Sequence, residues 1–165
     1  MTGVGPADRR TVLVIGASGI LGPAAAALAG RGDAVLGVSR GGRAVPPGVE
    51  SFVTDAADRA SLVAALEGRR WDDAVVYAPA VSDASSAELR GRTAGRFVLV
   101  RVTAAADPAR GPLDIPDDTV QLGWAAGRRW HTPDEVSAAA LVALDDGRPR
   151  LLGAVRPWSD RPSHR

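Results

Sequence analysis

The chain has 165 residues, 45% of them apolar and 24% charged, and its 20 Arg balance 19 Asp and Glu to a net charge of +1. It contains no Cys and no Lys, which excludes disulfides, thiolate nucleophiles, Cys-based zinc sites, Schiff-base lysines and Walker-type phosphate loops. The Arg residues are scattered among acids, and no apolar run reaches the length of a membrane span. We therefore expect a cytoplasmic protein that binds neither nucleic acid nor membrane.

The length fits one domain between two terminal tails. Residues 1–10 and 156–165 are polar and rich in Gly or Pro, so we expect a flexible N-terminal tail and a C-terminal tail. Residues 11–155 remain as a single domain, long enough to bury a hydrophobic core.

The domain alternates short apolar runs with helical segments, which is typical of a parallel α/β sheet. Strands are expected at 11–15, 34–38, 50–54, 73–77, 97–102, 119–122 and 151–155. Helices are expected at 23–29, 59–66, around 86–93, and from 133 to about 144, the last after a Thr132 cap with Glu135 in place for a capping box. The sequence thus predicts an α/β fold with a doubly wound parallel sheet.

A GxxGxxG motif lies between the first strand and an Ala-rich helix, in the segment Gly16-Ala17-Ser18-Gly19-Ile20-Leu21-Gly22. Small residues let the backbone approach a pyrophosphate, and the helix N-terminus offers unpaired N–H groups with a favourable dipole. This placement predicts a dinucleotide site in a Rossmann-type domain. The residues expected to bind the cofactor here are Gly16, Ser18, Gly19, Ile20, Leu21 and Gly22.

The end of the second strand indicates which cofactor is preferred. An acidic side chain at this point accepts a hydrogen bond from a free ribose 2′-hydroxyl, but here the strand closes with Ser39-Arg40, and Arg43 follows. An Arg suits a 2′-phosphate, so we expect NADP in preference to NAD. The alternative interpretation of Arg40 is a solvated surface residue.

These segments resemble the short-chain dehydrogenase/reductases, in particular short atypical members with a GxxGxxG loop. The similarity covers nearly the whole domain, through VLVIGASGILG, Ser39-Arg40, VTDAADRASLVAAL, DAVVYAPA and QLGW…HTPDEVSAAALVAL…LLGAV. The resemblance implies that Asp55 contacts the adenine ring and that Ala56 helps to form its pocket. It also implies that Ala78, in the segment after the fourth strand, lies beside the cofactor ribose.

The sequence departs from this family at the site of catalysis. The family's proton transfer rests on a Tyr and a Lys four residues apart on a helix, whereas this chain has Tyr77 as its single Tyr and no Lys. Three prolines in residues 102–119 exclude the long catalytic helix, so the domain is expected to be reduced on its substrate side. Tyr77 is the candidate catalytic residue, either as a proton donor or only as a packing partner of the nicotinamide.

Further candidate residues each have a structural alternative. Thr103 follows the fifth strand near the family's Ser, but a Thr at a strand end is also common for structural reasons. His131 is either an acid/base group or a surface residue beside a helix start. Trp124 and Trp130 are either walls of a pocket for a flat apolar ligand or anchors of a core or interface. With two His and no Cys, no metal site is expected.

Three functions follow from this resemblance. The first is an atypical NADP(H)-binding oxidoreductase acting on a small metabolite. The second is a non-redox enzyme (an isomerase, dehydratase or cyclase), in which the cofactor is retained or lost, and the third is a non-catalytic module that senses NADP(H) or binds a partner. The absent helix leaves a strip near the fifth and sixth strands that the Pro-rich loop, a second subunit or a ligand must cover, and we expect a homodimer or a contact with another partner there.

Overall fold

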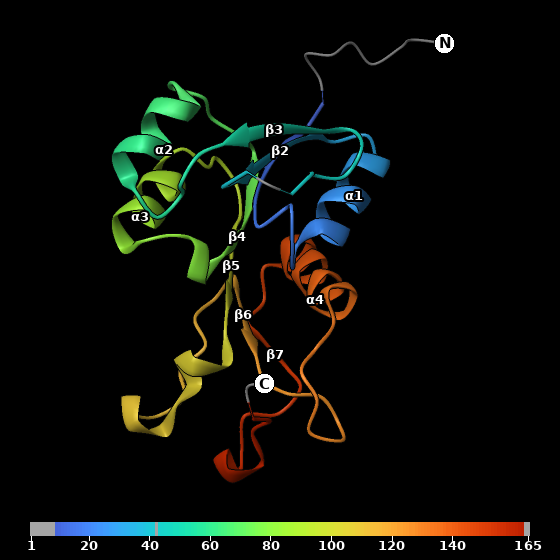
Figure 1. Cartoon of the computed structure of the whole chain (residues 1–165), viewed down its shortest axis with the longest axis vertical. Coiled ribbons are helices and arrows are strands. Elements are labelled where there is room, and N and C mark those ends of the chain that lie inside the picture. Colours follow the sequence, from blue (N-terminus) through green and yellow to red (C-terminus); the bar gives the residue numbers. More distant parts are fainter. Residues whose placement is uncertain (1–8, 42, 164–165) are drawn as a thin grey trace.

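The computed structural model describes residues 9–41 and 43–163, and in it seven parallel strands form one sheet in the order β3-β2-β1-β4-β5-β6-β7 (Figure 1). The strands are β1 (Thr11–Ile15), β2 (Ala34–Ser39), β3 (Val49–Val53), β4 (Asp73–Tyr77), β5 (Phe97–Arg101), β6 (Thr119–Leu122) and β7 (Arg150–Leu152). The helices are α1 (Gly22–Gly30), α2 (Arg59–Leu66), α3 (Asp83–Gly91) and α4 (Pro133–Asp146). The short 3₁₀ helices among the described residues are η2 (Ala78–Ala80), η3 (Thr103–Ala106), η4 (Pro108–Arg110) and η5 (Trp158–Asp160). The strand order reverses between β1 and β4, which confirms the predicted doubly wound α/β sheet.

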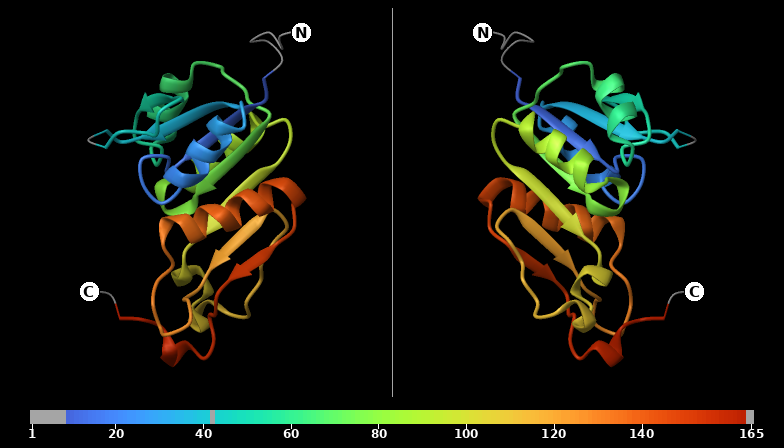
Figure 2. Two further views of the ribbon diagram at one scale, coloured as in Figure 1. Left: turned by 90° about the vertical axis from the view of Figure 1, so that its right-hand side faces the viewer. Right: turned by 90° about the vertical axis from the view of Figure 1, so that its left-hand side faces the viewer.

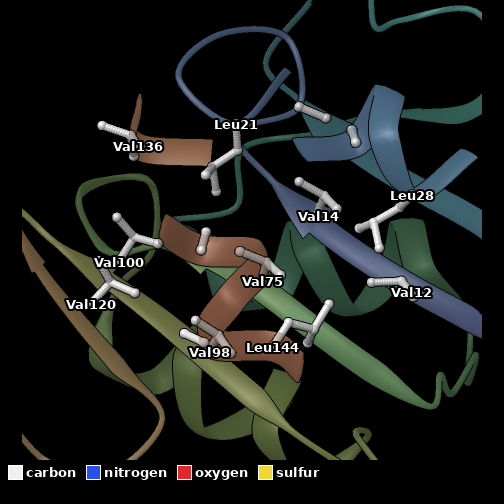
Figure 3. Close-up of a cluster of buried hydrophobic side chains, with 14 of the residues drawn as sticks. Val12, Val14, Leu21, Leu28, Val75, Val98, Val100, Val120, Val136 and Leu144 are labelled. Atoms are coloured by element: carbon white, nitrogen blue, oxygen red, sulfur yellow. The ribbon is translucent and has the colours of Figure 1, made fainter. Parts of the chain in front are cut away.

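Helices pack on both faces of the sheet, α1 and α4 on one and α2 and α3 on the other (Figures 1 and 2). Alternate residues of β1 point to opposite faces, so Val12 and Val14 belong to one core cluster and Leu13 and Ile15 to the other. The first cluster joins valines of β1, β4, β5 and β6 to Leu28 of α1 and to α4 (Figure 3). Burial on both faces explains why the central strands are continuously apolar.

Several elements differ from their predicted bounds by one or two residues, and α3 and β7 differ by three residues at one end. Helix α3 begins at Asp83 and not near 86, because the hydroxyl of Ser82 accepts a hydrogen bond from the backbone N–H of Ser85 and caps the helix. Strand β7 ends at Leu152, short of the predicted 155. Gly153 has a φ of +81°, and Ala154 forms an isolated antiparallel bridge with Trp124, so the chain has left the parallel sheet.

The strip of sheet beyond α3, over β5 and β6, is covered by the segment that contains η3 and η4 (Figure 2, right). The hydroxyl of Thr103 donates to the carbonyl of Leu122 at 3.1 Å, and the Arg101 guanidinium donates to the carbonyl of Asp114. Gln121 is fully buried on this face and its amide donates to two backbone carbonyls. Of the three predicted ways to cover this strip, the structure shows the Pro-rich segment, and the side chains beneath it are largely polar. The homodimer stays a prediction.

The segment predicted as a C-terminal tail contacts the domain through its described residues. The Arg156 guanidinium donates to the carbonyl of Ala106 at 2.9 Å, and the rings of Trp158 and Trp124 meet edge to face with centroids 6.1 Å apart. Asp160 forms an ion pair with Arg128 at 2.7 Å.

At the other end of the chain, residues 1–8 of the predicted N-terminal tail lie outside the described residues. The next residue, Arg9, donates to the carbonyl of Gly32 at 2.8 Å. Arg10 forms an ion pair with Asp33 at 2.7 Å. None of the helices formed by residues 9–41 and 43–163 is long and apolar enough to cross a membrane.

Candidate functional site

Two pockets lie where the strands end at the carboxyl edge of the sheet, and the loop 16–22 contributes to both. The first, of about 250 Å³, is called the Arg40 pocket and is lined by residues that include Gly16, Ser18, Ser39, Arg40, Ala56 and Ala80. The second, of about 400 Å³, is called the Tyr77 pocket and is lined by residues that include Ile20, Tyr77, Trp130, His131, Val136 and Arg161. They flank the point where the strand order reverses, which is where open α/β sheets bind their ligands.

The shape of the glycine loop depends on Gly16. Its φ is +106°, a conformation that L side chains rarely adopt, and a Cβ there would lie 3.2 Å from Cβ of Tyr77. The carbonyl of Gly16 accepts hydrogen bonds from the amides of Gly19 at 3.0 Å and Leu21 at 3.1 Å. Leu21 is fully buried in the core cluster, so it fixes the loop and does not point its side chain toward a ligand.

The centre of the loop is open and offers hydrogen-bond donors. A Cβ added at Gly19 would meet nothing within 4 Å. In the part of the chain that the structure describes, the amides of Ser18 and Ile20 donate to no protein group. On the far side, the Ser137 hydroxyl of α4 donates to the carbonyl of Ile20 at 3.2 Å and holds the loop in place. Open space and free N–H groups before the N-terminus of α1 suit a diphosphate.

The Arg40 pocket brings together the predicted adenosine-binding residues. Arg40 is 73% exposed, and its Nε lies 3.8 Å from Oδ1 of Asp55, which also accepts a hydrogen bond from the Ala57 amide at 3.0 Å. Ala56 is buried behind them, and Arg43 joins the lining. An exposed ion pair of this length contributes at most about 1 kcal/mol, so Arg40 can turn from Asp55 to a ligand at little cost.

Tyr77 ends β4 and is partly buried in the wall of the second pocket. Burial raises the pKa of its phenol, so the hydroxyl keeps its proton at neutral pH. Ala78 follows as the first residue of η2. Thr103 also lines this pocket, but its hydroxyl already donates to the carbonyl of Leu122, which favours the structural interpretation of this residue.

Glu135, in the first turn of α4, holds the loop that carries Trp130 and His131. Its carboxylate accepts hydrogen bonds from the Arg129 guanidinium at 2.6 and 3.1 Å and from the Thr132 amide at 3.0 Å, which completes the predicted capping box. The Arg129 hydrogen bonds, followed by those of Thr132 and His131, lower the pKa of Glu135 to about 2. The carboxylate is therefore charged across the physiological range and anchors the loop.

His131 is partly buried, with its side chain 8% exposed, and its ring lies between two acceptors. Its Nδ1 is 3.0 Å from Oε2 of Glu135, and its Nε2 is 3.2 Å from the carbonyl of Leu152. A neutral imidazole has one N–H and satisfies only one of these acceptors, whereas a protonated ring satisfies both. Because both nitrogens are engaged, the imidazole positions the pocket wall and has no nitrogen left to donate into the cavity.

The two tryptophans after β6 have different positions. Trp124 is buried in a small cluster with Ala106 and Val155, as the anchor interpretation predicts. Trp130 lines the Tyr77 pocket, as the pocket-wall interpretation predicts.

Three residues that line the pockets were not predicted as site residues from the sequence: Ala80, Val136 and Arg161. The apolar spacing of α4 signals that Val136 is buried, but no local pattern marks Arg161, which reaches the pocket from the C-terminal segment. Within residues 9–41 and 43–163, no three His, Cys, Asp or Glu side chains gather as metal ligands.

Comparisons with known proteins support the fold. No family model matches the sequence, and no curated protein does. A protein of Thermus thermophilus is similar in structure with a TM-score of 0.58 at 18% identity, over 88% of this chain and 97% of that one. A Burkholderia multivorans structure with bound NADP, provisionally described as a short-chain dehydrogenase/reductase, gives 0.52 at 20% identity over 90% and 97%. A Bacteroides thetaiotaomicron protein, provisionally described as an epimerase, gives 0.54 at 14% identity over 96% and 100%.

Proposed function

We propose that this chain binds a nicotinamide dinucleotide across the two pockets, with its pyrophosphate on the glycine loop. The observation that carries the proposal is the open position at Gly19, next to the free amides of Ser18 and Ile20, between two pockets at the strand-order reversal. The Burkholderia multivorans structure was described with NADP, and its likeness in fold is consistent with the proposal.

The Arg40 pocket would hold the adenosine half, and NADP is the preferred form. Arg40 and Arg43 line this pocket together, and two guanidinium groups suit the charge and geometry of a 2′-phosphate. Asp55 and Ala56 lie at the same corner, where the resemblance to the short-chain dehydrogenase/reductases assigns the adenine ring. The nicotinamide half would lie in the Tyr77 pocket, with its ribose beside Ala78.

The activity we propose is that of an atypical oxidoreductase of the short-chain dehydrogenase/reductase type, without the Tyr and Lys dyad. Bound NADPH supplies a hydride. Tyr77 lines the pocket on this side of the loop, and its phenol is the candidate proton donor to the carbonyl oxygen that the hydride leaves charged. Burial raises the pKa of Tyr77, so the phenol is protonated at neutral pH, which is the state that a proton donor requires, although it is a weaker acid than an exposed tyrosine.

The alternatives are a non-redox enzyme, with its cofactor retained or lost, and a non-catalytic module. A lost cofactor predicts a blocked loop or a closed adenosine corner, whereas Gly19 is unobstructed and the Arg40 pocket has a volume of about 250 Å³. A sensing module needs no space beyond the dinucleotide, whereas the Tyr77 pocket, which would hold the nicotinamide half, continues from Tyr77 to Trp130 and Arg161. The first observation favours a chain that has kept its cofactor, and the second favours an enzyme over a module.

The test is a fluorescence titration of NADPH and NADH into the wild type, Gly19→Asp and Gly91→Asp. Neither glycine has a positive φ or an atom within 4 Å of an added Cβ, so both variants should fold. Only Gly19 lies on the glycine loop, and an Asp there would repel a pyrophosphate. We expect the wild type and Gly91→Asp to bind both cofactors, NADPH more tightly, and Gly19→Asp to bind neither. Absence of binding to the wild type, or full binding by a folded Gly19→Asp, would refute the proposal.

A further inference from the structure

We infer that the substrate of the Tyr77 pocket is a small apolar monocarboxylate, whose carboxylate binds Arg161 while its apolar part lies against Ile20 and Trp130. This inference deepens the proposed function and rests on it. Three observations on the described residues support it: the lining of the pocket is mainly apolar, the guanidinium of Arg161 donates to no carboxylate or carbonyl, and Asp160, the acid next to it in the chain, pairs with Arg128.

The walls of the pocket are mainly hydrocarbon. They come from the loops after the strands, the first turn of α4 and the C-terminal segment; the apolar members include Ile20, Val102, Leu122, Trp130 and Val136. None of the described residues that line the pocket is Asp or Glu. The whole pocket has a volume of about 400 Å³, near the small end of the range of roughly 300–1,000 Å³ found for ligand sites, and the nicotinamide half of the proposed cofactor would occupy part of it. The pocket therefore suits a small molecule with an apolar part and no positive charge.

Arg161 is the cation of this pocket that is free to bind a ligand. Its guanidinium lies 4.9 Å from the ring centre of Trp158, which orients the side chain. Among the described residues, no carboxylate or carbonyl accepts a hydrogen bond from its side chain. His131 also lines the pocket, but both of its ring nitrogens face acceptors outside the cavity.

The acid next to Arg161 is already neutralised. Asp160 binds the Arg128 guanidinium at 2.7 Å, and this pair joins η5 to the loop after β6. Glu135, at the start of α4, is likewise committed to Arg129, His131 and the Thr132 amide. The positive charge of Arg161 is therefore not cancelled by its neighbours and attracts an anion into the pocket.

A carboxylate fits this arrangement better than a phosphate. One guanidinium offers two parallel N–H donors, which match the two oxygens of a carboxylate and balance its single charge. A phosphate would bring a second charge and further acceptor oxygens into an apolar pocket with no second free cation among the described residues. The substrate class that follows is a monoanionic carboxylic acid whose compact hydrocarbon body carries the carbonyl group that the proposed function reduces.

The test uses two matched probe pairs, benzoate with benzamide and hexanoate with hexanamide, titrated calorimetrically into the full chain at saturating NADPH. Each amide keeps the shape of its acid and removes the charge. The variants are Arg161→Gln, Arg161→Lys and the control Arg148→Gln. Arg148 is exposed and precedes the start of β7, so it lies at the amino ends of the strands, whereas the pocket lies at their carboxyl ends. Cofactor binding is measured first for every variant, so that a failure of the proposed function is recognised separately.

We expect the wild type and Arg148→Gln to prefer each carboxylate over its amide. Arg161→Gln should lower the affinity for the carboxylates about tenfold or more and leave the affinity for the amides unchanged. Arg161→Lys should be intermediate, because a lysine keeps the positive charge but lacks the two parallel N–H donors of the guanidinium. Unchanged amide binding would show that the pocket is intact. Equal affinity for acid and amide, no binding of either, or equal loss in Arg161→Gln and Arg148→Gln would overturn the inference in a protein that binds NADPH normally.

Discussion

Replacing Arg40 by Asp should reverse the preference of this chain between NADPH and NADH. Arg40 lines the corner of the Arg40 pocket and is 73% exposed, and among the described residues its guanidinium makes one weak contact, with Asp55 at 3.8 Å. A 2′-phosphate would take the place of Asp55 as its partner. An Asp at this position would repel the phosphate but could accept a hydrogen bond from the free 2′-hydroxyl of NADH.

The size of the effect follows from this exposed position. A hydrogen bond between charged groups contributes about 1.5–3 kcal/mol, and the screening of an exposed side chain favours the lower end of that range. A like charge placed at about 4 Å in a water-like dielectric adds about 1 kcal/mol of repulsion. The sum of about 2–3 kcal/mol corresponds to a loss of NADPH affinity of roughly 30- to 150-fold. The affinity for NADH should stay the same or rise.

The assay is a fluorescence titration of both cofactors at about 0.1 M salt, where the Debye length of about 10 Å limits long-range effects of the charge change. The control is Arg148→Asp, next to the start of β7 and far along the sheet from the end of β2. It makes the same change of charge and should leave the affinities for NADPH and NADH unaltered. Equal losses for NADPH and NADH in Arg40→Asp would show that the side chain does not bind the 2′-phosphate.

Four further predictions test other parts of the structure. Gly16→Ala should lower the free energy of unfolding by about 1–3 kcal/mol in urea, and by more than Gly32→Ala, because both have a positive φ but only Gly16 has a close neighbour, at 3.2 Å. Tyr77→Phe should keep NADPH binding and reduce carbonyl turnover about a hundredfold; unchanged turnover would remove the phenol from the chemistry. The pKa of Glu135 is lowered from 4.5 to about 2, so the stability that its carboxylate contributes is complete above pH 4.5 and is lost as the pH falls toward 2. The melting temperatures of wild type and Glu135→Gln should therefore converge as the pH falls through this interval. A constant difference in melting temperature would contradict this role. Sedimentation equilibrium at micromolar concentration should show the predicted homodimer, and a monomer would contradict it.

Local patterns in the sequence predict most of the sheet but not the contacts between distant segments. The bounds of β1, β4 and β6 match the prediction because each is an apolar run that ends at a polar residue, a turn or a glycine. The end of β7 was wrong because it depends on the pairing of Ala154 with Trp124, which no local pattern reveals. In the same way, the glycine loop and Arg40 are visible in the sequence, whereas the place of Arg161 depends on the docking of η5 against Trp124.

The walls of the Tyr77 pocket come from segments that begin at Ile20 and end at Arg161, so the cavity exists only when nearly the whole described chain is folded. A molecule that binds there binds the native state and not the unfolded chain. At a hundred times its dissociation constant it would raise the free energy of unfolding by about 2.7 kcal/mol, which for a chain of this size is roughly 5–11 °C in melting temperature. Thermal denaturation in the presence of a library of small acids can therefore identify ligands of this protein before any reaction has been observed.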